Sequence, residues 1–456
     1  MPLITVDPST GKIVKTYAAH RPAQIEIALS RAARSSAAWA AQSVAARSRV
    51  LKAAGVALRR RRDRWAALIV QEMGKPISEA RAEIEKCASC CDFYAKHGAR
   101  FLSEETPFAA PPGGTVRFDP LGVVLAIMPW NFPFWQAFRA AAPALIGGNA
   151  MLLKHASNVC GCALAIEAVF KEAGAPRGVF QTLLIGSDLV PALIADDRIH
   201  GLTLTGSTAA GKKVAALAGA SLKPCVFELG GSDPYLVFED ADLDRAAEVC
   251  AAARLVNTGQ SCVAAKRFIV IASVRAVFEE KLAARMRARR QGDPTDPDTE
   301  VGPMAREDLR AELHGQVSRS VKAGARLLAG GQLPKGAGYF YPPTVLTDVR
   351  PGMPAYDDEL FGPVASVISA RNETAALKIA NDSPYGLGSA VFTADAARAR
   401  RVIRGLYAGT VAVNDSVRSD VALPFGGVKQ SGYGRELGAW GARTFVNVKT
   451  VRWQKR

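Results

Sequence analysis

Between residues 120 and 228 the chain alternates between apolar, strand-like runs and helix-like runs, and no other feature constrains the fold as much. The strand-like runs are GVVLAIMP, AMLLKHAS, GVFQTLLIG and IHGLTLTG. Helix-like runs such as GCALAIEAVFKEAGAP and STAAGKKVAALAGA lie between them. Strands and helices that alternate in this way form a parallel sheet with helices on both faces. We therefore predict an α/β fold whose ligands lie at the carboxyl ends of the strands.

The remainder of the chain extends this pattern. The first ~100 residues carry apolar side chains at helical spacing, and after residue 240 the alternation resumes with AEVCAAARLVNTG and KRFIVIA. The run FVNVKTVRW at 445–453 alternates like an exposed strand, which needs a partner edge in this chain or in another subunit. A length of 456 residues predicts two or three domains.

The formal charge of +16 favours anionic partners in general. The two densest basic runs, LRRRRDRW at 58–65 and RMRARRQGD at 285–293, lack interleaved stacking aromatics, so we interpret them as solvated helix faces and expect no nucleic-acid partner. No run approaches the ~18 apolar residues of a membrane span, and the N-terminus lacks the pattern of a secretory signal. We therefore expect no membrane association and a cytoplasmic location with reduced thiols.

The chain has eight cysteines, and one of them differs from the rest. Cys87, Cys90 and Cys91 lie on one face of a predicted helix, and no second Cys or His pair accompanies them at a metal-binding spacing, so we predict buried residues and no metal site. Cys262, in TGQSCVAAKRF, lies among small residues that leave room for a substrate. A thiolate there would be a nucleophile if its pKa were lowered.

Three further segments each allow two interpretations. In TGSTAAGKKV, the residues Gly206, Ser207 and Gly211 either form a phosphate-binding turn or simply cap a helix of small residues. Asn131, fixed between two prolines in PWNFP, either stabilises an oxyanion or holds a turn. Glu228, ahead of the two glycines of ELGG, is either a general base or a surface acid.

The order of the segments resolves this ambiguity. PWNFP, GSTAAG, ELGG and GQSC are followed by ELFGP at 359–363 and PFGGVKQSGYGRE at 424–436. With these six motifs in order, the chain resembles the NAD(P)-dependent aldehyde dehydrogenase superfamily from end to end. The resemblance implies an aldehyde dehydrogenase-like α/β fold, with a Rossmann-type cofactor domain, an α/β catalytic domain and a small β oligomerisation element.

The resemblance also implies where these parts lie. The cofactor domain occupies residues 1–229 and the catalytic domain residues 230–420. The oligomerisation element combines a hairpin at about 106–124 with a strand near the C-terminus, and residues 421–456 return to the cofactor domain before forming that strand. This arrangement implies a homodimer or homotetramer.

The catalytic roles follow from the same resemblance. Cys262 matches the nucleophile that attacks the aldehyde carbon, and Asn131 matches the side-chain donor to the oxyanion. Glu228 matches the base that activates water to hydrolyse the thioester. A thiol suits both steps because it is a good nucleophile and a good leaving group. The cofactor implied is NAD(P)⁺, and the residues matched to its binding are Trp130, Lys154, Ser157, Gly206, Ser207, Gly211, Glu359 and Phe361.

Ser157 bears on the choice between the two cofactors. Many NAD-preferring relatives carry a glutamate three residues after the lysine that Lys154 matches, and that glutamate binds the ribose 2′-hydroxyl. A serine does not repel a 2′-phosphate as a carboxylate would. We expect NADP⁺ to be accepted together with NAD⁺, in a ratio that the sequence leaves open.

Within the superfamily the chain is most similar to the bacterial succinate-semialdehyde dehydrogenase branch, through segments such as MPWNFPFWQAFR and NTGQSCVAAKRF. Arg139 falls where that branch carries an arginine for the distal carboxylate of the substrate. The alternative is an arginine on a helix face. A second arginine of some members is replaced here by Val256, and Arg418 and Ser419 are candidates for the missing polar contacts.

Three other functions stay open at this point. A CoA-acylating dehydrogenase would not need Glu228 as a base for water, and a broad-range enzyme for aliphatic, aromatic or amino-aldehydes would not need Arg139. A non-catalytic protein that reuses the fold would not need Cys262, Glu228 and Asn131 together. We therefore predict an enzyme whose partner is a small-molecule aldehyde, with succinate semialdehyde as the expected substrate.

Overall fold

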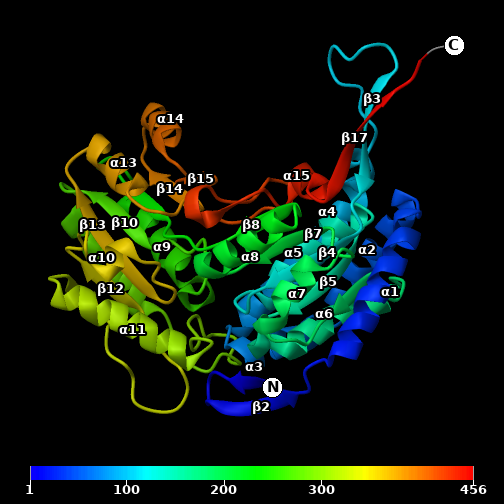
Figure 1. The fold of residues 1–456 in the computed structure, drawn as a ribbon. Coiled ribbons are helices and arrows are strands. Elements are labelled where there is room, and N and C mark those ends of the chain that lie inside the picture. The colour runs from blue at the N-terminus through cyan, green and yellow to red at the C-terminus, as the bar shows by residue number, and fades with distance from the viewer. Residues whose placement is uncertain (1, 455–456) are drawn as a thin grey trace.

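The computed structural model describes residues 2–454, which form two large sheets, a two-stranded ribbon and an N-terminal hairpin (Figure 1). The strand order is β16-β8-β7-β4-β5-β6 in the six-stranded sheet and β11-β12-β13-β10-β9-β14-β15 in the seven-stranded sheet. The strands are β1 (Leu3–Asp7), β2 (Lys12–Tyr17), β3 (Gly114–Pro120), β4 (Val123–Met128), β5 (Ala150–His155), β6 (Phe180–Thr182), β7 (Gly201–Thr205), β8 (Cys225–Glu228), β9 (Pro234–Val237), β10 (Arg267–Ile271), β11 (Arg326–Ala329), β12 (Thr344–Thr347), β13 (Val364–Ala370), β14 (Gly388–Phe392), β15 (Thr410–Val413), β16 (Gly432–Tyr433) and β17 (Val446–Arg452).

Helices alternate with these strands, which confirms the predicted α/β class. They are α1 (Pro22–Ala40), α2 (Val44–Arg60), α3 (Arg62–Met73), α4 (Ile77–Phe101), α5 (Pro133–Ile146), α6 (Cys160–Glu172), α7 (Val190–Ala195), α8 (Thr208–Ala220), α9 (Leu243–Leu255), α10 (Arg275–Ala288), α11 (Glu307–Lys322), α12 (Pro354–Asp357), α13 (Glu373–Asn381), α14 (Ala396–Gly405) and α15 (Gly438–Arg443). Short 3-10 helices include η1 (Ser157–Val159) and η3 (Val256–Gly259).

The six-stranded sheet is buried on both faces. Val123 and Leu125 of β4 pack with α1, α7 and α8, whereas Val124 and Ala126 pack with α2 to α6 on the other side. Strands β4 to β8 pair in parallel, and only β16 runs antiparallel, beside β8. Continuous apolar runs such as VVLAIM are typical of strands that are covered on both faces.

The seven-stranded sheet follows the same rule. Tyr235 and Val237 of β9 pack with α9 and α10, and Leu236 and Phe238 pack on the opposite face with α11, α13 and α14. The chain passes between the two sheets through residues 229–233, which join β8 to β9. It returns when β16 pairs with β8, where Gly432 lies opposite Glu228.

The ribbon of β3 and β17 projects from the body of the molecule (Figure 1). Seven antiparallel pairs join the two strands, from Val446 opposite Pro120 to Arg452 opposite Gly114. Within the region predicted as a hairpin, at 106–124, β3 takes the C-terminal strand as its partner along its length, while Val116 also forms a local antiparallel bridge with Glu105. Three prolines between residues 107 and 112 withhold the backbone N–H groups that a local strand would need.

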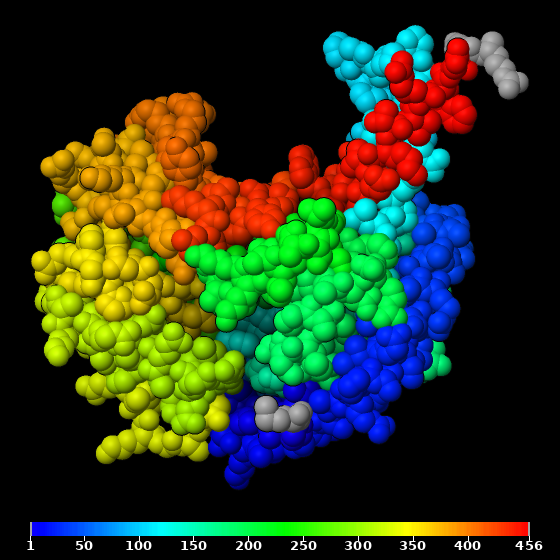
Figure 2. All heavy atoms as spheres, viewed as in Figure 1, coloured from blue at the N-terminus to red at the C-terminus, as the bar shows by residue number. Residues whose placement is uncertain are grey.

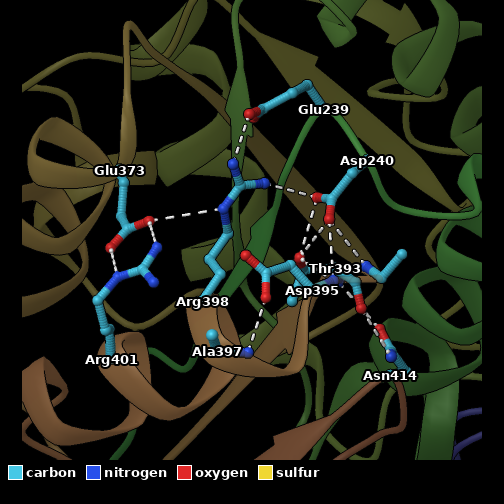
Figure 3. Close-up of polar contacts among 10 residues, drawn as sticks. Glu239, Asp240, Glu373, Thr393, Asp395, Ala397, Arg398, Arg401 and Asn414 are labelled. Carbon is cyan, nitrogen blue, oxygen red and sulfur yellow. Dashed lines mark hydrogen bonds and ion pairs between the residues drawn. The ribbon is translucent and has the colours of Figure 1, made fainter.

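A charged network holds the carboxyl ends of β9, β14 and β15 together (Figure 3). The carboxylate of Asp240 accepts hydrogen bonds from Thr393 Oγ1 at 2.7 and 2.9 Å and from Arg398 at 2.6 Å. The side chain of Asn414 binds the backbone N–H and C=O of Thr393, each at 3.0 Å. The charge-assisted hydrogen bonds of Asp240 fix the start of α14 against the end of β9, and those of Asn414 join the ends of β14 and β15.

Candidate active site

The parallel strands bring four groups of side chains to one edge of the six-stranded sheet. Ser157 follows β5, Asn131 follows β4, Ser207 follows β7, and Glu228 ends β8, all at carboxyl ends. Segments far apart in the sequence meet here because adjacent parallel strands end on the same side.

A cleft of about 790 Å³ opens at this edge. Its opposite wall comes from the second half of the chain, and Figure 2 shows the surface hollowed between the regions of α8 and α11. The lining includes seven of the residues predicted for the site, namely Trp130, Asn131, Gly206, Ser207, Cys262, Glu359 and Phe361. The other predicted residues do not line it: Lys154, Ser157, Gly211, Glu228, Arg139, Arg418 and Ser419.

The nucleophile segment is held in an unusual backbone conformation. Asn257, Thr258 and Gly259 all have positive φ angles, of 54°, 55° and 72°, just before Cys262. Residues other than glycine rarely adopt this region, so the surrounding contacts must enforce it. The backbone N–H of Asn257 donates to Glu79 Oε2 at 2.7 Å, and its side-chain amide donates to the carbonyl oxygen of Asn131 at 2.7 Å.

Asn131 lies against this same segment. Its amide nitrogen donates to the carbonyl oxygen of Gln260 at 3.0 Å, which leaves its second N–H available. The side chain is buried and lines the cleft together with Cys262. A held amide donor beside a nucleophile can stabilise an oxyanion without reorganising.

Cys262 is half-buried between groups of opposite charge. Burial raises the pKa of its thiol to about 12, while the positive charges of Arg139 and Lys266 act to lower it. The carboxylates of Glu228 and Glu359 act in the raising direction. The balance of these nearby charges therefore acts on how readily the thiolate of Cys262 forms.

Glu228 is a buried carboxyl without a hydrogen-bond partner. It is 1% exposed, and neither of its oxygens has a polar contact within the described residues. Burial raises its pKa to about 8, the charge of Arg139 lowers it, and Glu436 raises it again. Its Oε1 lies toward Gly426, where a Cβ atom would be only 2.8 Å away, so glycine is needed there to accommodate the carboxyl. A carboxyl with a raised pKa in an apolar site suits proton transfer near neutral pH.

The turn after β7 opens α8 toward the cleft. Ser207 caps this helix, because its side chain accepts a hydrogen bond from the backbone N–H of Ala210 at 3.3 Å. The first turn of a 13-residue helix then presents free N–H groups to the cleft. Gly211 instead has a packing role, since a Cβ there would lie 2.5 Å from the side chain of Leu229.

Lys154 and Ser157 lie at the end of β5, beside this edge but outside the cleft. Lys154 is half-buried, and burial lowers its pKa, whereas Ser157 is exposed at the start of η1. Across the cleft, Phe361 and Trp130 meet edge to face with ring centres 5.9 Å apart. Of these four residues, Phe361 and Trp130 line the cleft.

Arg139 does not have the free guanidinium group that the sequence led us to expect. Its side chain is 2% exposed, forms an ion pair with Glu436, and donates to Thr205 Oγ1 at 3.1 Å. The guanidinium also lies 5.0 Å from the ring centre of Phe425. Because Arg139 is buried and pairs with Glu436 through its Nε, the structure supports a role for Arg139 in neutralising buried carboxylates near Cys262 and Glu228.

Arg418 and Ser419 differ in their surroundings. Arg418 is exposed and pairs with Asp415 at 2.6 Å, so it faces away from the interior. Ser419 accepts a hydrogen bond from Lys86 Nζ at 2.8 Å, and that ammonium lies 4.4 Å from the ring centre of Trp135. Burial lowers the pKa of Lys86 to about 8, with a further lowering by Arg139. Lys86 is therefore a second buried cation close enough to Arg139 for the two charges to interact.

A family model for the aldehyde dehydrogenase family matches residues 2–451. The chain belongs to the aldehyde dehydrogenase family. This confirms the resemblance that the six motifs indicated, and it confirms the fold class.

Individual relatives match the chain over nearly its whole length. A probable NADP(+) succinate-semialdehyde dehydrogenase of Synechocystis sp. is 48% identical over 99% of both chains. The succinate semialdehyde dehydrogenase [NAD(P)+] Sad of Escherichia coli is 46% identical over 99% of this chain and 98% of its own. Among solved structures, succinic semialdehyde dehydrogenase from Streptococcus pyogenes in complex with NADP+ has a TM-score of 0.97 at 36% identity, over 99% of this chain and 100% of that one.

Sequence reasoning missed part of this aldehyde dehydrogenase site. One face of α11 lines the cleft through Leu309, Glu312, Leu313 and Gln316, and Gln316 donates to the carbonyl oxygen of Glu359 at 3.5 Å. The spacing of these four residues indicates one helix face, but mixed polarity gives no sign that it faces a cleft. Glu436 was also missed, although it lies in the quoted motif PFGGVKQSGYGRE.

Two kinds of feature are absent from residues 2–454. No three His, Cys, Asp or Glu side chains in that range are placed to hold a metal ion. Within the same residues, none of the helices combines the length and apolar character of a membrane span.

Proposed function

We propose that this enzyme oxidises succinate semialdehyde to succinate with NAD(P)⁺. The observation that carries the proposal is the meeting of Cys262 and Asn131 in a cleft at the carboxyl edge of the six-stranded sheet, with Glu228 buried nearby. The relatives described above are named as succinate-semialdehyde dehydrogenases and match end to end, which supports this substrate.

Cys262, Asn131 and Glu228 have separate roles in this reaction, and water supplies the oxygen that is added. The thiolate of Cys262 adds to the aldehyde carbon, and the amide of Asn131 donates to the new oxyanion. NAD(P)⁺ held by residues such as Ser207 and Glu359 would supply the hydride acceptor, and loss of hydride from the former aldehyde carbon would leave a thioester on Cys262. Glu228 removes a proton from water as the water attacks the thioester, and the thiolate of Cys262 leaves as succinate forms.

The cleft fits a dinucleotide. Its volume falls within the range of small-molecule and cofactor sites, the helix start at Ser207 offers N–H groups to a pyrophosphate, and Glu359 offers a carboxylate to a ribose hydroxyl. The relatives' cofactors are printed as NADP(+) or NAD(P)+. We propose the same here, with Lys154 and Ser157 at the adenosine end.

Ser157→Glu is expected to change the cofactor preference. A carboxylate at this exposed position would repel a 2′-phosphate, so kcat/KM for NADP⁺ should fall by ~10–100-fold while kcat/KM for NAD⁺ is held or rises. Steady-state kinetics with both cofactors measures this. Ser157→Gln is the matched control, because it adds similar bulk without charge. Equal losses with both variants would mean that size, and not charge, decides.

The substrate is tested with two aldehydes of equal carbon number. We expect kcat/KM for succinate semialdehyde to exceed that for butanal by ~10²-fold or more, because a carboxylate bound by a buried cation contributes a few kcal/mol. Lys86→Met should remove part of this preference without changing the rate with butanal. If the two aldehydes react alike, the enzyme is a broad-range aldehyde dehydrogenase, and the cysteine chemistry is unaffected.

We also propose that the enzyme is a homodimer or homotetramer. A two-stranded ribbon is marginally stable alone, yet β3 and β17 project from the body and expose Val448 and Trp453. Strand β15 is an uncovered edge of the seven-stranded sheet and exposes Val413. If the β3–β17 ribbon of one copy packed against strand β15 of another copy, the contact would cover the ribbon and the exposed sheet edge. Sedimentation equilibrium should give the mass of two or four chains, and a single-chain mass would contradict this assembly.

We also propose a cytoplasmic location, because eight free thiols suit a reducing compartment.

A further inference from the structure

Lys266 is a buried lysine that binds the segment carrying the nucleophile. It is 1% exposed and lies at the end of this segment, immediately before β10. Its Nζ donates to the carbonyl oxygens of Ser261 and Cys262 at 3.0 Å each and of Ala264 at 3.2 Å. An ammonium has three donors, so all three serve this one segment.

The same ammonium contacts a residue of the cofactor cleft. Lys266 Nζ lies 3.4 Å from Glu359 Oε1, which also accepts the backbone N–H of Gly231 at 3.1 Å. Glu359 lines the cleft, whereas Lys266 does not. The carboxylate therefore joins the inside of the cleft to the buried side of the nucleophile segment.

We propose that Lys266 is a positioning residue that transmits occupation of the cofactor cleft, through Glu359, to the segment that carries Cys262. The inference rests on the proposed cofactor site. When a ribose hydroxyl donates a hydrogen bond to the carboxylate of Glu359, the negative charge of Glu359 moves away from Lys266. The ammonium keeps its three carbonyl contacts, and its positive charge then acts on the Cys262 thiolate without the opposing carboxylate.

The charges around both groups agree with this coupling. Cys262 faces Arg139 and Lys266, which lower its pKa, and Glu228 and Glu359, which raise it. Lys266 faces Arg254 as well as the carboxylates of Glu359 and Asp233 and the thiol of Cys262. Of the groups that act on Cys262, Glu359 is the one that both contacts Lys266 and lines the cleft.

The experiment is alkylation of Cys262 by iodoacetamide, followed by mass spectrometry of the peptide that contains it, between pH 6 and 10 and with or without saturating NADP⁺. In the wild type, NADP⁺ should accelerate alkylation at pH 7 by ~10-fold, the effect of lowering the thiol pKa by about one unit. In Lys266→Met the acceleration should fall below ~2-fold, while NADP⁺ still quenches tryptophan fluorescence at a similar concentration. Lys266→Arg, which keeps the charge, should recover part of the response.

Two further variants keep the test decisive. Lys223→Met is the matched control, because Lys223 Nζ also donates to two backbone carbonyls, those of Ile194 and Asp196, at 2.6 and 2.5 Å in the cofactor half. It should retain the full response to NADP⁺. Glu359→Gln should alkylate faster than the wild type without any cofactor, which tests the coupling even if Lys266→Met does not fold.

Three results would overturn the proposal. These are a full NADP⁺ response in folded Lys266→Met, a Glu359→Gln variant that alkylates like the cofactor-free wild type, and a wild type that binds NADP⁺ without a change in alkylation. In each of these cases NADP⁺ binding and turnover leave the proposed function intact. A wild type that neither binds NADP⁺ nor oxidises an aldehyde would instead reject the proposed function itself.

Discussion

Cys262→Ala is expected to lower kcat for aldehyde oxidation by at least ~10⁴-fold, because no covalent intermediate can form without the thiol. The affinity for the cofactor should be unchanged, because Cys262 is one of many residues that line the cleft and its truncation to alanine is small. Steady-state turnover and titration of tryptophan fluorescence with NADP⁺ measure the two effects separately.

Cys225→Ala is the control for this variant. Cys225 is the other half-buried thiol, and it lies at the start of β8, where it contacts the backbone carbonyl of Lys223. Its loss should leave kcat within ~2-fold of the wild type. The remaining six cysteines are buried and lie outside the lining of the cleft, whereas Cys262 lines it, so their position keeps them from the substrate. If Cys262→Ala retained turnover, the nucleophile would have to be another residue.

Glu228→Gln is expected to stop the reaction after hydride transfer. The thioester would still form on Cys262, but no base would deprotonate the attacking water, so steady-state turnover should fall by ~10²–10⁴-fold. Rapid-mixing absorbance should show a burst of one reduced cofactor per site, followed by a slow phase. A variant with full turnover and no burst would assign the base to another group, and Glu436, which is buried and paired with Arg139, is a candidate.

The same residue predicts a pH dependence. Glu228 accepts a proton only as the carboxylate, and its pKa is raised to about 8 chiefly by burial. The rate of thioester hydrolysis should therefore rise with pH through this value and level off above it. The rise should be absent from the slow phase of Glu228→Gln. A slow phase that keeps the wild-type pH profile would show that the profile belongs to a different group.

Much of the catalytic chemistry could be predicted from the sequence because it lies in short local motifs. The order of the six motifs predicts Cys262 as the nucleophile, and the run of strands and helices predicts the sheet at whose edge Asn131 and Glu228 lie. The helix cap at Ser207 was predictable for the same reason, since a cap depends on neighbouring residues alone. Gly211 shows the limit of this reasoning, because its contact with Leu229 depends on how α8 lies against the sheet.

The sequence by itself determined the fold class and the family, and it predicts the residues that serve as nucleophile, oxyanion donor and base. Only the tertiary structure decided which charges face them. Arg139 is paired by Glu436, β3 is paired by β17, and Glu359 reaches Lys266, each across a long separation in the sequence. The physical reason is that propensity and capping act between near neighbours, whereas the partner of a buried charge or of an exposed strand edge is set by long-range packing, which no local pattern records.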